Sequence, residues 1–113
     1  MVMQLLSVAS EIYPLIKTGG LADVTGALPG ALVGEGVATR TLVPGYPAVI
    51  ARIGKAKVMR RYDALFGVAA TVLAARVDGL DLLVLDAPDF FAREGGPYGD
   101  HAGHDWVDNW RRF

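Results

Sequence analysis

The chain has 113 residues, the size of one domain, and 52% of them are apolar against 20% charged. A net charge of −1 and the absence of cysteine exclude a strong basic field for nucleic acid, a disulfide framework and a thiolate metal site. The first residues lack the basic segment of a signal peptide, and no apolar stretch is long enough to span a bilayer. We therefore expect a cytoplasmic protein without nucleic-acid or membrane partners.

The N-terminal part predicts a strand, a loop, a helix and a second strand. Residues 5–9 form a nearly continuous apolar run, as in a strand buried on both faces. From residue 21 the apolar period changes to three and four, which predicts a helix with one apolar stripe of Leu21, Val24, Leu28 and Leu32. Pro29 is expected to kink this helix, and Gly34 and Gly36 to end it. Residues 37–43 predict a parallel strand, so the first loop should lie where parallel strands end, at the edge that binds ligands.

The middle of the chain predicts further strands. Residues 57–66 and 68–77 have β-branched and aromatic content and are joined at Gly67, which is typical of a β-hairpin. Residues 80–85 predict the next parallel strand. The fold class is therefore α/β, with a mostly parallel sheet and an inserted β-hairpin.

The C-terminal part has weaker patterns. Residues 90–103 have no regular period and predict a loop, and residues 104–113 predict the start of a helix with Asp105 as its cap. The chain stops where this helix should continue, which suggests a truncated sequence.

Lys17-Thr18-Gly19-Gly20, between the first strand and the first helix, predicts a phosphate site. Glycines let the backbone approach an oxyanion and reach positive φ at little cost, and the helix start offers free N–H groups and partial positive charge. Lys17 adds a full charge. The pattern is neither a Walker loop nor Gly-x-Gly-x-x-Gly, so it does not indicate a dinucleotide cofactor, and a plain turn stays open.

Three weaker patterns have structural alternatives. His101 and His104 with Asp100 and Asp105 resemble an incomplete metal cluster, and a flexible polar loop is the preferred interpretation. Glu11 and Asp23 form either a carboxylate pair or, preferably, a loop acid and a helix-start charge. The turn that ends in Tyr98 displays an aromatic ring suited to a sugar face, unless that ring packs internally.

A long block of the sequence resembles the N-terminal signature of bacterial glycogen synthases and plant starch synthases. The block is Ser10-Glu11-Ile12-Tyr13-Pro14-Leu15-Ile16-Lys17-Thr18-Gly19-Gly20-Leu21-Ala22-Asp23-Val24, followed by Gly26-Ala27-Leu28-Pro29. Further matches are Leu42-Val43-Pro44-Gly45-Tyr46-Pro47, Asp86-Ala87-Pro88, Arg93, Gly95-Gly96-Pro97-Tyr98 and Asp108-Asn109-Trp110-Arg111-Arg112-Phe113. The resemblance implies that residues 1–113 are the N-terminal part of a starch synthase catalytic domain, within the first of the two Rossmann-like domains of a GT-B glycosyltransferase.

The resemblance also implies an activity and a site. These enzymes transfer glucose from ADP-glucose to the non-reducing end of an α-1,4-glucan such as glycogen, with retention and without metal or cofactor. Lys17 would contact the donor phosphates, with Thr18, Gly19 and Gly20 in the loop against the donor. Tyr98 would line the active site, and Glu11 and Asp23 would lie close to it.

Two departures limit this expectation. Phe91 stands where the family often has tyrosine, and the family's active-site histidine, its arginine–lysine pair and its late glutamate lie beyond Phe113. We therefore expect the 113 residues alone to be inactive and to fold marginally or associate. Alternatives are a non-catalytic α/β module that binds phosphate or a nucleotide sugar, and a UDP-sugar transferase of the same fold.

Overall fold

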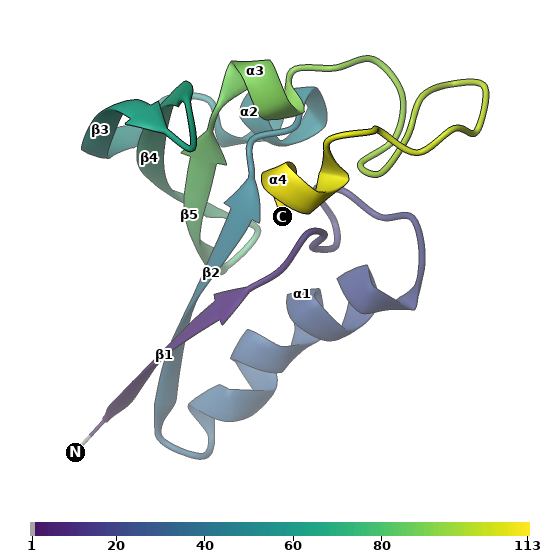
Figure 1. Ribbon diagram of the computed structural model, residues 1–113. Coiled ribbons are helices and arrows are strands. Elements are labelled where there is room, and N and C mark those ends of the chain that lie inside the picture. The colour runs from purple at the N-terminus through teal and green to yellow at the C-terminus, as the bar shows by residue number, and fades with distance from the viewer. Residues whose placement is uncertain (1) are drawn as a thin grey trace.

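The computed structural model describes residues 2–113, which form a five-stranded mixed sheet flanked by helices (Figure 1). In chain order the elements are β1 (Met3–Val8), α1 (Gly20–Val33), β2 (Val37–Pro44), α2 (Pro47–Ile53), β3 (Lys57–Leu65), β4 (Val68–Val77), β5 (Leu80–Asp86), α3 (Pro88–Phe91) and α4 (Asn109–Arg112). The strand order is β1-β2-β5-β4-β3. β1, β2 and β5 run parallel, and β4 and β3 are antiparallel, so the predicted α/β class with an inserted hairpin is confirmed. None of the helices in residues 2–113 combines the length and apolarity needed to cross a membrane.

Two tight turns join β3, β4 and β5. Phe66 and Gly67 have φ angles of 50° and 87°, and Asp78 and Gly79 have 51° and 78°. Positive φ at both central residues gives a turn whose twist matches that of the flanking strands. The hairpin at Gly67 and the parallel pairing of β5 with β2 are confirmed. The antiparallel pairing of β5 with β4 was not predicted.

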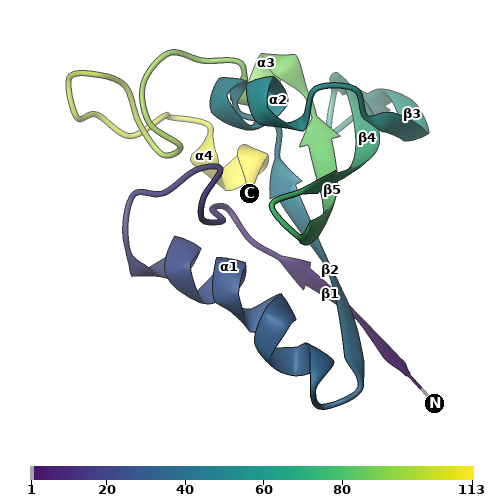
Figure 2. The same cartoon turned by 180° about the vertical axis from the view of Figure 1, so that it is seen from behind.

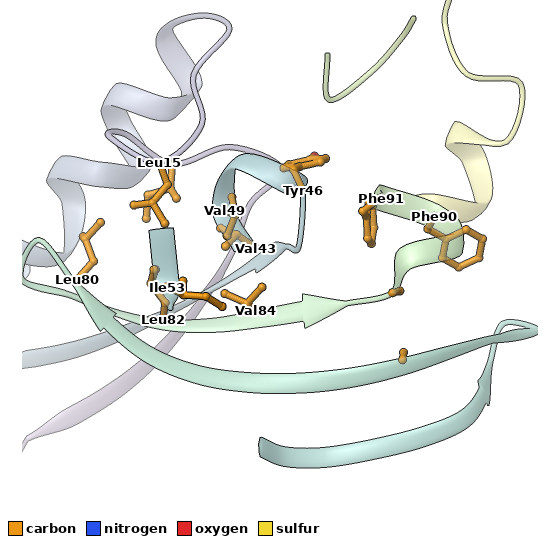
Figure 3. Close-up of a cluster of buried hydrophobic side chains, with 13 residues drawn as sticks. Leu15, Val43, Tyr46, Val49, Ile53, Leu80, Leu82, Val84, Phe90 and Phe91 are labelled. Carbon is orange, nitrogen blue, oxygen red and sulfur yellow. The ribbon is translucent and has the colours of Figure 1, made fainter. Parts of the chain in front are cut away.

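The core lies between α2 and the sheet. Val49 and Ile53 of α2 face Val43, Leu82 and Val84 of β2 and β5 (Figure 3). Val49, Leu82 and Val84 are fully buried, and each such side chain stabilises the fold by roughly 1.5–3 kcal/mol. Helix α2 was not predicted, although its signals are present: a proline at the first position and apolar residues four apart.

The predicted helix α1 is present, but its apolar stripe is not the face that the described residues bury. Leu21, Val24 and Leu28 are 48%, 61% and 37% exposed, while Ala22 and Thr25 are the buried residues of α1. The reason is a close approach of the loop before α1: a Cβ on Gly26 would lie 2.5 Å from the Tyr13 carbonyl oxygen. Loop backbone packs on the small-residue face of the helix, which turns the leucine face outward.

The ends of α1 follow the prediction more closely. The helix runs through Pro29 without a break and ends at Val33, before Gly34. Gly36 has a φ of 76°, and its N–H donates to the Val33 carbonyl at 3.1 Å. Gly36 therefore supplies the left-handed residue that a helix end commonly uses.

The prediction that the first strand is buried on both faces is also wrong for these residues. Within residues 2–113, β1 is an edge strand that pairs with β2 alone. Met3, Leu6 and Val8 are 66%, 55% and 70% exposed. An apolar run indicates side chains that favour burial. It does not show whether residues 2–113 include the segment that buries them.

The C-terminal helix is shorter than predicted. α4 covers only Asn109–Arg112 with Asp108 at its N-cap, so Asp105 is not the cap; it pairs with Gly99 in an isolated bridge instead. The Trp106 N–H donates to the Tyr98 carbonyl, which holds this segment against the preceding loop. α3 also lies at the start of the predicted loop, directly after β5. Loop contacts, rather than helix propensity, decide the structure here.

The exposed edge of β1 predicts self-association of the 113-residue chain. Unpaired strand edges with apolar side chains template intermolecular pairing. We expect Leu6→Lys to shift the chain toward monomer, because a charge on the edge opposes strand pairing. Sedimentation velocity over a concentration series measures this.

The matched control is Val107→Lys, which changes a 94% exposed residue away from the sheet. We expect it to leave association unchanged. A wild-type chain that stays monomeric at every concentration and melts cooperatively would contradict the prediction.

Candidate functional site

The candidate site lies at the carboxyl ends of the parallel strands. Figures 1 and 2 show the loop from β1 to α1 passing beside α4 and the long loop that precedes α4. These segments are far apart in sequence, and side-chain hydrogen bonds join them. This is the edge at which open α/β sheets bind ligands.

The core anchors the loop between β1 and α1. The Ile12 N–H donates to the Ile16 carbonyl at 3.1 Å, and the Ile16 N–H returns to the Ile12 carbonyl at 3.0 Å. Ile12 and Leu15 are 0% and 5% exposed and belong to the core cluster. The residues on either side of this anchored segment, Glu11 and Lys17, therefore start from fixed backbone positions.

Glu11 is the centre of a hydrogen-bonded set, which we call the Glu11 cluster: Ser10, Glu11, Thr18 and Tyr98. Glu11 is 2% exposed. Its Oε1 accepts the Thr18 backbone N–H at 2.6 Å, and its Oε2 accepts the Thr18 hydroxyl at 2.6 Å and the Tyr98 hydroxyl. The Ser10 Oγ lies 2.6 Å from the Tyr98 hydroxyl oxygen. The sequence placed Glu11 near the site but did not indicate that it binds Thr18.

The cluster sets the protonation states of its members. Burial raises the pKa of Glu11, but the hydrogen bonds from Thr18, Tyr98 and the Thr18 and Gly19 backbone outweigh it, and the pKa falls below 4.5. Burial and the hydrogen bond to Glu11 raise the pKa of Tyr98. At neutral pH the cluster is therefore an ionised carboxylate held by neutral donors.

Lys17 and Asp23 form an ion pair at the start of α1. The Lys17 Nζ lies 2.7 and 2.6 Å from the two carboxylate oxygens of Asp23. Asp23 makes no side-chain cap for the helix, so its predicted place is right but its partner is Lys17. The two side chains are 46% and 52% exposed, and such surface pairs contribute about 0–1 kcal/mol. A multiply charged phosphate can compete with Asp23 for this amine.

Gly19 and Gly20 form an open N-terminus of α1. Gly19 has φ −163°, so it is extended and does not use the left-handed region that was expected. Instead, a Cβ built on either glycine would meet no atom within 4 Å. The N-cap residue Gly19 makes no side-chain cap for α1, so it leaves the N–H groups of the first turn without that partner. The glycines therefore provide room rather than an unusual backbone angle.

The turn before Tyr98 exists as predicted, because the Gly96 N–H donates to the Gly99 carbonyl at 2.9 Å. The ring of Tyr98 is half-buried and lies 5.8 Å from that of Phe113, with its hydroxyl in the Glu11 cluster. The Tyr98 hydroxyl thus makes hydrogen bonds within the protein and does not point freely to a ligand. Of the predicted site residues, the structure joins Glu11, Thr18 and Tyr98 in one set and Lys17 and Asp23 in another.

Arg112 and Asn109 support the Tyr98 loop and were not predicted. Arg112 is 7% exposed, and it donates to the Phe90 carbonyl at 2.7 Å and the Pro97 carbonyl at 3.1 Å. Its guanidinium lies over the rings of Phe91, Trp106 and Phe113. The Asn109 amide donates to the Tyr98 carbonyl at 2.8 Å. The sequence shows an arginine among aromatic residues here, but it does not identify the carbonyl groups that the arginine binds.

An ion pair between Arg93 and Asp108 joins the two ends of the loop that carries Tyr98. Both guanidinium N–H arms of Arg93 donate to the Asp108 carboxylate at 2.6 Å. This hydrogen-bonded pair raises the pKa of Arg93 and lowers the pKa of Asp108. The two-armed geometry orients the loop ends as well as attracting them.

A cavity beside the Tyr98 loop does not contain the predicted phosphate loop. It has a volume of about 620 Å³ and is lined mainly by apolar side chains, including Phe91, Trp110 and Phe113, with Ser10 and Tyr98 at its wall. Lys17, Thr18, Gly19 and Gly20 are not among its lining residues within the described part of the chain. An apolar cavity does not suit a diphosphate, so the open N-terminus of α1 is the better candidate.

The histidine-containing loop has an internal structural role. The Asp100 carboxylate accepts the backbone N–H groups of Ala102 and His104 at 3.0 and 2.9 Å. In the part of the chain from residue 2 onward, no three metal-ligating side chains are grouped to hold an ion. Asp100 is thus a turn-stabilising residue.

Comparison with known proteins finds relatives across nearly the whole chain. The profile of the starch synthase catalytic domain matches residues 4–113. Glycogen synthase 1 of Rhizobium meliloti (strain 1021) is 65% identical over 111 residues, which cover 98% of this chain and 23% of that protein. A glycogen synthase of Novosphingobium aromaticivorans is 52% identical over 113 residues, all of this chain and 23% of that protein.

A solved structure gives the same result for the fold. The catalytic domain of starch synthase IV from Arabidopsis thaliana, bound to ADP and acarbose, superposes with a TM-score of 0.71 at 25% identity. The match covers 99% of this chain and 23% of that one. The chain thus spans about a quarter of the length of the proteins it matches.

The lowered pKa of Glu11 predicts a pH-dependent stability. Its folded pKa lies below the ordinary 4.5, so the ionised form stabilises the fold above that pH, and this contribution is lost as the pH falls through the folded pKa. We expect Glu11→Gln to lower the free energy of unfolding by about 1–2 kcal/mol at neutral pH. Denaturant titrations from neutral to acidic pH should show this difference shrinking in acid.

Glu35→Gln is the control, because Glu35 is an exposed glutamate in the turn after α1. We expect no comparable loss at any pH. A deficit of Glu11→Gln that is constant with pH would contradict the assigned protonation state.

Proposed function

Because the chain belongs to the starch synthase catalytic domain family, we propose that the whole protein is a glycogen synthase. It would transfer glucose from ADP-glucose to the non-reducing end of an α-1,4-glucan, with retention of anomeric configuration. The identity of 52–65% to proteins named glycogen synthase supports the reaction, and a related structure bound to ADP and acarbose supports the ligand classes.

The observation that carries the proposal is the open start of α1 beside Lys17. Its uncapped N–H groups and the space over Gly19 and Gly20 suit an anion. The leaving group of the transfer is a nucleoside diphosphate, on which negative charge develops. Donors that meet this charge lower the barrier.

Lys17 has a defined role in this proposal. In the structure its amine pairs with the Asp23 carboxylate. On donor binding the amine would turn to the diphosphate, and Asp23 would remain as a favourable charge in the first turn of α1. The exchange replaces a weak exposed ion pair with a charge-assisted phosphate contact.

Donor choice separates the main alternatives. An ADP-glucose enzyme, a UDP-sugar transferase of the same fold and a non-catalytic binding module all use a phosphate-binding loop. Titration of the full-length protein with ADP-glucose, UDP-glucose and ADP, followed by assay of glucan elongation, distinguishes them. A cytoplasmic location without membrane or nucleic-acid partners stays a prediction from the sequence.

Substitution of Lys17 tests its role. In the full-length protein we expect Lys17→Ala to lower kcat/KM for ADP-glucose by at least about tenfold, the scale of one lost charge-assisted contact. Steady-state kinetics with glycogen as acceptor measure the change. The control is Lys55→Ala, which removes an exposed lysine after α2. Unchanged kinetics for Lys17→Ala would remove this residue from the site.

The 113 residues alone are expected to be inactive. They span 23% of the relatives' length, and one wall of a site cannot complete a glucosyl transfer. Incubation with radiolabelled ADP-glucose and glycogen should give no incorporation above background. Incorporation by the isolated chain would refute this expectation.

A further inference from the structure

The Glu11 cluster connects two loops that are far apart in the chain. The Tyr98 hydroxyl and the Glu11 carboxylate belong to residues 87 positions apart, and the same carboxylate holds Thr18 by both its backbone N–H and its hydroxyl. Thr18 lies between Lys17 and Gly19 in the proposed phosphate loop. The cluster is therefore the described side-chain link between Tyr98 and that loop.

Tyr98 is the fixed end of this link. Its carbonyl accepts the Asn109 amide at 2.8 Å and the Trp106 N–H at 3.0 Å. Arg112 holds the preceding carbonyl of Pro97 and also donates to the Asn109 side chain at 2.6 Å. The motif at residues 108–113 thus clamps the backbone on which Tyr98 stands.

Glu11 transmits this fixed position. Its backbone carbonyl accepts the Thr25 hydroxyl of α1 at 2.7 Å, and its neighbour Ile12 is fully buried. Its carboxylate is oriented by the Tyr98 hydroxyl on one side and binds Thr18 on the other. The backbone and the side chain of Glu11 are therefore both constrained.

Thr18 is the loop end of this link, because it binds Glu11 and leads directly into Gly19 and Gly20. Gly19 and Gly20 are open on the side where a Cβ would be, and the N-cap residue Gly19 makes no side-chain cap for α1. Loss of the bonds to Glu11 would free the backbone that leads into the first turn of α1. The direction of the Gly19 and Gly20 N–H groups would then no longer be set.

We propose that Glu11 and Tyr98 are positioning residues that preorganise the 17–20 loop for the donor diphosphate, with Tyr98 itself held by Asn109 and Arg112. This inference rests on the proposed function and assigns a task to the Tyr98 hydroxyl other than contact with sugar. A preorganised loop binds its anion without first losing conformational entropy. The binding of the glucan acceptor should not depend on the link.

A double-mutant cycle in the full-length protein tests the proposal. Tyr98→Phe removes only the hydroxyl, and Glu11→Gln keeps the shape and one acceptor oxygen. We expect each to lower kcat/KM for ADP-glucose about tenfold while KM for glycogen stays within about twofold. The double variant should fall little further than the worse single variant, because both changes break one link. Tyr62→Phe, on β3, is the matched control and should have no effect.

Hydrogen exchange provides a readout that does not need activity. Mass spectrometry of peptides that contain residues 17–20 should show faster exchange in Tyr98→Phe and Glu11→Gln, with thermal melting as the check that each variant is folded. If the wild type does not turn over ADP-glucose, the proposed function fails, while exchange still tests the link. Unchanged exchange, or kinetic losses that multiply in the double variant, would overturn the proposal and make Tyr98 an independent contributor.

Discussion

The arrangement of the candidate site depends on one ionised carboxylate that is withdrawn from water. Removing the Glu11 charge from solvent is costly unless hydrogen-bond donors replace the lost water. This protein supplies them from three places: the Thr18 backbone, the Thr18 side chain and the Tyr98 hydroxyl. The need to satisfy one buried charge thus determines how two distant loops meet.

The same requirement explains why the long loop before α4 is so strongly held. A donor for Glu11 is useful only if its own backbone is fixed. Arg112 uses its buried guanidinium to bind carbonyl groups, and Arg93 pairs with Asp108 to close the loop. Aromatic rings around Arg112 replace part of its lost hydration.

Local patterns predicted most of the strands and the position of α1. The turn at Gly67 and the helix end at Gly36 were predictable because both use positive φ, which glycine adopts readily. The exposure of Leu21, Val24 and Leu28 was not predictable, because periodicity identifies an apolar stripe but not the surface that covers it. The face of α1 that carries small residues is the buried one because it contacts the Tyr13 backbone. Helical periodicity does not predict this contact.

The residues of the candidate site also divide into those that the sequence predicted and those that it did not. Lys17, Gly19 and Gly20 were predictable from adjacency, since a cation, two glycines and a helix start are read from consecutive residues. The resemblance indicated that Tyr98 and Glu11 lie close together, and the structure adds the hydrogen bond and its extension to Thr18. Asn109 and Arg112 were missed because their partners are carbonyl groups, which carry no signature in the sequence.

The separation of 87 residues between Tyr98 and Glu11 has a consequence for biosynthesis. At about 5–20 residues per second, the ribosome adds the tyrosine roughly 4–17 seconds after the glutamate. Until then the Glu11 carboxylate lacks the Tyr98 hydroxyl as a donor and stays hydrated. The loop between β1 and α1 is therefore not yet held by its full set of hydrogen bonds. Completion of this corner of the molecule therefore follows synthesis of the first loop and waits for the aromatic–arginine segment to emerge.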